Sequence, residues 1–70
     1  MDIHKLVEEF TWSSYDTKRN KVIDMLKQLS PTHETFAMFY KTIISLHNVQ
    51  ENVLIYLYQS ILEIESFLPD

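Results

Sequence analysis

The 70-residue chain contains no glycine, no cysteine and only two prolines. Without cysteine it can form neither a disulfide nor a thiolate metal site. Small secreted domains usually depend on disulfides, so this absence favours a cytoplasmic location. Without glycine, the chain lacks the loops that cradle phosphates and the residue that tight hairpin turns usually need. Together these absences favour an all-α fold.

Positive charge is scarce in the second half of the chain. Residues 1–30 carry five acidic and five basic side chains, whereas residues 31–70 carry five acidic side chains and one basic side chain, Lys41. The net charge of −4 therefore comes entirely from the second half. This balance disfavours nonspecific nucleic-acid binding, which depends on Lys and Arg against phosphates, and is compatible with a basic partner.

Long apolar runs are also missing. The longest run covers the six residues 53–58, far fewer than the ~20 needed for a membrane span. Residues 1–15 have no basic segment followed by an apolar one, so we expect no signal peptide. Hydrophobic residues nevertheless make up 46% of the chain and aromatic residues 13%, which indicates a folded protein. Its length indicates one α-helical domain, residues 1–70.

The last third organises this expected fold. Its apolar positions from Val53 onward continue at helical spacing to Leu68, and Asn48 with Glu51 resembles a capping box. We predict a helix over 49–67. Its polar sector is narrow, so it needs cover on more than one side.

Three shorter helices are predicted before it. Asp2 can cap a helix over 3–10, Ser13 can cap one over 15–29, and Ser30 before Pro31 is typical of a helix start, here over 31–46. Because the break after the third helix is short, the last two helices should form an antiparallel hairpin. The prediction is a small four-helix bundle with a C-terminal helical hairpin, centred on the last helix.

A second apolar stripe on the last helix is the preferred candidate for partner binding. It consists of Ile55, Tyr58 and Leu62, on the side away from the main stripe. Either a partner or another helix of the same chain must cover it, and we favour a partner or a second copy. Met38 and Trp12 are added as apolar side chains expected at the surface.

No catalytic or cofactor-binding pattern is present, so we expect no enzyme. The pair His4 and Glu8 has helical spacing but lacks a third metal ligand. The role of His47, at the end of the third predicted helix, stays open between a helix cap, a core position and a functional group.

A basic cluster on the second helix offers an alternative. Its members Lys18, Arg19, Lys21 and Lys27 precede a helix-turn-helix-like break. The helix that would enter the major groove has one Lys and no Arg, Asn or Gln, which makes it a poor reader of bases. A third alternative, membrane association through Trp12 and the first helix, is disfavoured by the acidic rim of that helix.

The sequence thus predicts a small non-enzymatic interaction protein, of the inhibitor or adaptor type, that acts in the cytoplasm. We expect it to bind another protein or to form a homodimer through its last two helices. A DNA-associated regulator that uses the basic cluster is the alternative.

Overall fold

The computed structural model describes residues 2–65, with side chains as far as Ile64, and contains four helices within that range. They are α1 (Ile3–Thr11), α2 (Tyr15–Leu29), α3 (Glu34–Ser45) and α4 (Glu51–Glu65), and no strand occurs among the described residues. The all-α four-helix bundle is confirmed. The last two residues of the helix predicted over 49–67 lie outside the described range.

The first two helices begin at the side-chain caps that their sequences offer. The Asp2 carboxylate accepts a hydrogen bond from the His4 backbone N–H at 2.9 Å, as expected of an N-cap. For α2 the predicted cap was one residue early: the Ser14 hydroxyl accepts from the Thr17 N–H at 3.1 Å. Ser13 instead donates to the carbonyl of Phe10.

The predicted start of α3 was wrong by three residues. Ser30 is the C-cap of α2 and not the N-cap of α3, since its N–H donates to the Leu26 carbonyl at 2.9 Å. The N–H groups of Thr32 and His33 both reach the Leu29 carbonyl at 3.0 Å, so residues 30–33 close the end of α2. A proline lacks the N–H needed to continue a helix and is therefore common just after a helix end, the role that Pro31 has here.

The start of α4 is also later than predicted. Val49 stays outside the helix because its N–H donates to the Tyr15 hydroxyl at 2.7 Å and its side chain is buried. The first α4 hydrogen bonds are accepted by the Gln50 carbonyl, so α4 begins at Glu51. This link between α2 and the connection before α4 is tertiary, which is why local sequence patterns did not reveal it.

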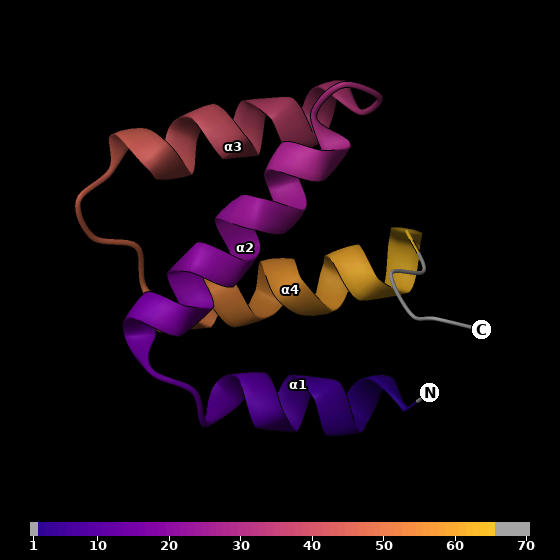
Figure 1. Cartoon of the computed structure of the whole chain (residues 1–70), viewed down its shortest axis with the longest axis vertical. Helices are drawn as coiled ribbons and strands as arrows, with labels where there is room; N and C mark the ends of the chain where they lie inside the picture. The colour runs from indigo at the N-terminus through magenta and orange to yellow at the C-terminus, as the bar shows by residue number, and fades with distance from the viewer. Residues whose placement is uncertain (1, 66–70) are drawn as a thin grey trace.

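Packing follows the order α1, α4, α2, α3. Among the described residues, the closely packed helix pairs are α1 with α4, α4 with α2, and α2 with α3. In Figure 1, α3 and α4 run in opposite directions, as a hairpin would, while α2 crosses obliquely between them. Both therefore rest on α2 rather than closely on each other, and α2 shares the centre of the bundle with α4.

The molecule is a slab of 31 × 27 × 14 Å. A thickness of 14 Å fits two layers of helices, because axes ~8–10 Å apart with a Cα radius of ~2.3 Å give ~13–15 Å. The core of the molecule consists of one cluster of apolar side chains, the largest share of them from α4: Phe10, Val22, Met25, Leu26, Leu29, Phe36, Ile43, Val49, Leu54, Leu57, Tyr58, Ile61 and Leu62.

Candidate binding groove

The stripe predicted to bind a partner is covered within the chain. Tyr58 and Leu62 are 7% and 4% exposed, and Ile55 is partly buried against the core. The cover comes from α1: the Phe10 ring stacks on the Tyr58 ring with centroids 4.0 Å apart and planes 5° apart. Of the two alternatives, partner contact or core, the core describes Tyr58 and Leu62.

The surplus apolar surface of α4 lies on its opposite edge. Tyr56 is 70% exposed and Ile64 is 66% exposed. Val53, Tyr56, Ser60 and Ile64 follow one another at helical spacing, so this edge forms a stripe beside the buried face. Among the described residues, α1 and α2 pack closely on other sides of α4, whereas α3 does not pack closely against it.

A groove separates this stripe from α3. It is an open depression of about 580 Å³. Phe36 and Leu57 are its most buried members, whereas Phe39, at 41% exposure, and Tyr56 offer aromatic surface to solvent. The groove residues contributed by the facing helices are Phe36, Phe39, Tyr56, Leu57, Ser60 and Ile64, with residues 32–35 at one end.

Charge is nearly absent from the groove. Glu34 is its only acidic or basic side chain apart from His33, counted over the described lining residues. The Glu34 carboxylate is exposed, lies in the first turn of α3 and forms no ion pair within residues 2–64. His33 is held beside it, with its ring 2.9 Å from the Thr32 hydroxyl and tilted against Phe36. The groove therefore combines an apolar floor with one acidic end.

Polar contacts from α2 fix the loop that sets the angle between α3 and α4. Arg19 donates from one guanidinium nitrogen to the carbonyls of Ile43, at 2.9 Å, and Leu46, at 2.7 Å, at the end of α3. The Tyr15 hydroxyl accepts a hydrogen bond from the Val49 N–H in the same connection. These side chains satisfy backbone groups that a helix end and its following loop leave unpaired. The connection between α3 and α4 is thus held against α2.

The four residues of the basic cluster do not form one exposed surface in the fold. Lys18 is 2% exposed; its ammonium group donates to the Ser13 carbonyl and lies 4.0 Å from the Glu51 carboxylate. The Arg19 guanidinium group donates its hydrogen bonds to carbonyls at the end of α3. Only Lys21 and Lys27 remain exposed, so the structure does not bring four cations together for phosphate binding.

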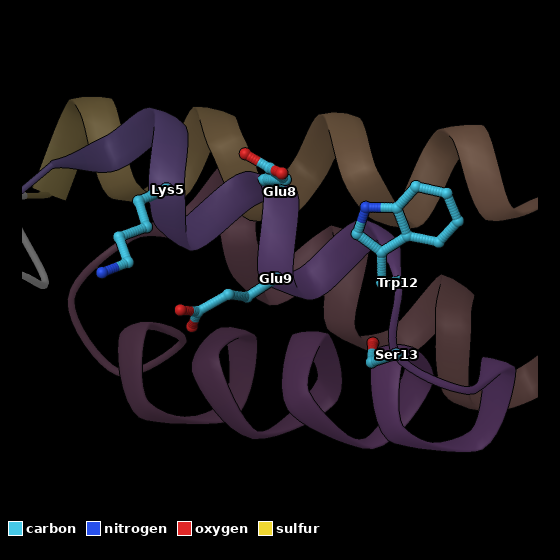
Figure 2. Close-up of a pocket in the computed structure, with 5 residues that line it drawn as sticks. All are labelled: Lys5, Glu8, Glu9, Trp12 and Ser13. Carbon is cyan, nitrogen blue, oxygen red and sulfur yellow. The ribbon is translucent and has the colours of Figure 1, made fainter.

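The two other predicted surface residues are exposed but lie outside the groove lining. Met38 is 65% exposed on α3. Trp12 is 82% exposed and contributes to a separate shallow depression of about 460 Å³. In Figure 2 its ring stands off the end of α1, while Lys5 and Glu9 extend from another side of that helix.

The structure brings no third metal ligand to His4 and Glu8 among the described residues. Within the described residues, no three His, Cys, Asp or Glu side chains gather in a way that could hold a metal ion. Exposed His4 lies in α1, whereas exposed His47 follows α3. Among the described helices, none has the length and apolar character to cross a membrane.

Comparison with protein-family models, curated proteins and solved structures finds no match to this chain. Sequence reasoning missed Phe39, Tyr56 and Ile64 as its exposed members. The signal that pointed toward them was the narrow polar sector of the last helix, which indicated uncovered apolar surface without indicating which edge carries it.

Proposed function

We propose that this protein is a small non-enzymatic interaction module, of the inhibitor or adaptor type, that binds another protein or a second copy through the α3/α4 groove. The main support is the groove itself: exposed aromatic and aliphatic side chains, one charged end, and fixed walls. Interface centres are similarly depleted of charge and enriched in aromatic residues. Tyr56 is the expected anchor, since it is a large aromatic side chain at the groove and 70% exposed.

Self-association through the groove is tested by the mass in solution. Light scattering behind a sizing column, over a hundredfold concentration range, would compare the natural chain with Tyr56→Asp. Asn52→Asp serves as the matched control, because Asn52 is exposed on α4 and lies outside the groove lining. Circular dichroism would confirm that all three chains are folded.

Each result has a distinct meaning. A mass near twice the 8.4 kDa of the chain, lost in Tyr56→Asp and kept in Asn52→Asp, would support self-association through the groove. A dimer that survives both substitutions would place the contact elsewhere and contradict the groove. A constant mass near 8.4 kDa would exclude the second copy and leave a different protein as the partner.

A further inference from the structure

We propose that the α3/α4 groove binds an amphipathic α-helix of another protein, one that carries Lys or Arg beside its apolar stripe. This inference rests on the proposed function and names the chemistry of the partner. It is drawn from the dimensions of the groove and from the distribution of charge around it.

The groove has room for a short helix. Along α4 it extends from Tyr56 to Ile64, eight residue steps or ~12 Å at ~1.5 Å per residue, which is roughly two helical turns. Both walls rest on α2 without packing closely on each other, which leaves the depression between them open to a further helix. Helices that bind in grooves typically present apolar anchors at positions i, i+3 or i+4, and i+7, which span such a length.

Charge complementarity favours a basic partner. Glu34 stands at one end of the groove without an ion pair among the described residues, and residues 31–70 carry five acidic side chains against Lys41 alone. A Lys or Arg next to the apolar stripe of a partner helix would pair with Glu34 and fix its direction. A second copy would instead bring another net charge of −4 and another Glu34 to the same contact.

The proposal is tested by selection from a displayed library of three-turn helical peptides, randomised at the apolar positions and at their flanks. The full-length chain is the target, and Tyr56→Asp is the counter-target. We expect recovered peptides to carry apolar residues at helical spacing, with Lys and Arg exceeding Asp and Glu about 1.5- to fivefold at the flanks, the effect of one exposed ion pair. The excess should fall in 0.5 M salt, where the screening length is short.

Two variants locate the effect. Selection on Glu34→Gln should remove the excess of basic residues while apolar spacing persists. Glu8→Gln, at an exposed carboxylate of α1 outside the groove, should leave the excess unchanged.

The outcomes separate this inference from the proposed function. Peptides that require Tyr56 but show no basic excess would overturn the basic partner and leave the groove function intact. Failure to recover any peptide that distinguishes the natural chain from Tyr56→Asp would overturn both. A concentration-dependent dimer abolished by Tyr56→Asp would show that a second copy occupies the groove and would overturn the heterologous helix.

Discussion

The aromatic rings of Phe10 and Tyr58 lie face to face, with centroids 4.0 Å apart and planes within 5°. This contact joins the end of α1 to the middle of α4, and α4 is the only helix against which α1 packs closely among the described residues. It explains why the Tyr58 side of α4 is core and leaves the Tyr56 side as the open edge.

Truncation of the two tyrosines of α4 should therefore lower the free energy of unfolding to very different extents. Tyr58→Ala should lower the free energy of unfolding by ~3–5 kcal/mol, because a buried ring and its stacking partner lose contact. Tyr56→Ala, at a 70% exposed position, should change it by less than ~0.5 kcal/mol. Urea unfolding followed by circular dichroism measures both, and equal losses would contradict the assignment of core and groove.

Arg19 should contribute to stability rather than to nucleic-acid binding. Arg19→Met keeps most of the aliphatic stem but removes the bonds to the Ile43 and Leu46 carbonyls. Because hydrogen bonds from charged donors contribute ~1.5–3 kcal/mol, the free energy of unfolding should fall by about that amount. Lys21→Met, at an exposed position nearby, is the control and should have an effect within ~0.5 kcal/mol. Comparable losses in the two variants would show that the Arg19 contacts are not important.

The Tyr15 hydroxyl should protect one specific amide. Tyr15→Phe retains the ring but leaves the Val49 N–H without its acceptor, at a cost of ~1–3 kcal/mol. Hydrogen exchange at Val49, followed by NMR, should become faster than in the natural chain. Tyr40→Phe removes a hydroxyl that does not contact Val49 and should leave that exchange rate unchanged. An unaltered rate in Tyr15→Phe would mean that the loop is held by other contacts.

Alkaline pH should weaken the fold through Tyr58. Burial raises the pKa of the Tyr58 hydroxyl above its ordinary value of 10.0, and the nearby Glu9 carboxylate raises it further. Above pH 10 the unfolded chain loses this proton before the folded chain does, so the stabilisation present below pH 10 is lost as pH rises through the folded pKa.

Comparing unfolding midpoints between pH 8 and pH 11 tests this dependence. Tyr58→Phe, which keeps the stacked ring, should show a shallower decline than the natural chain. Glu9→Gln should lower the Tyr58 pKa, because it removes the smaller of the two causes. If Tyr58→Phe declined as steeply as the natural chain, other groups would account for the alkaline loss.

Local chemistry determined the all-α fold, the bounds of α2 and the start of α1. Apolar spacing placed α2 at its observed residues, and Asp2 fixed the start of α1. The absence of glycine favoured an all-α fold, and the narrow polar sector of the last helix indicated that it needs cover on more than one side. These features depend on neighbouring residues in the sequence, so the sequence alone was sufficient to infer them.

Tertiary structure decided which apolar surface stays open. The helical spacing of apolar residues cannot tell which side of α4 packs against α1. The contact between Phe10 and Tyr58, 48 residues apart in the sequence, determines that side. The hydrogen bonds of Lys18 and Arg19 could not be predicted from the sequence either. The acceptor of Lys18 belongs to a loop, and that of Arg19 to a distant helix end. The groove exists because α3 and α4 both rest on α2, and that arrangement depends on the packing of all the helices together.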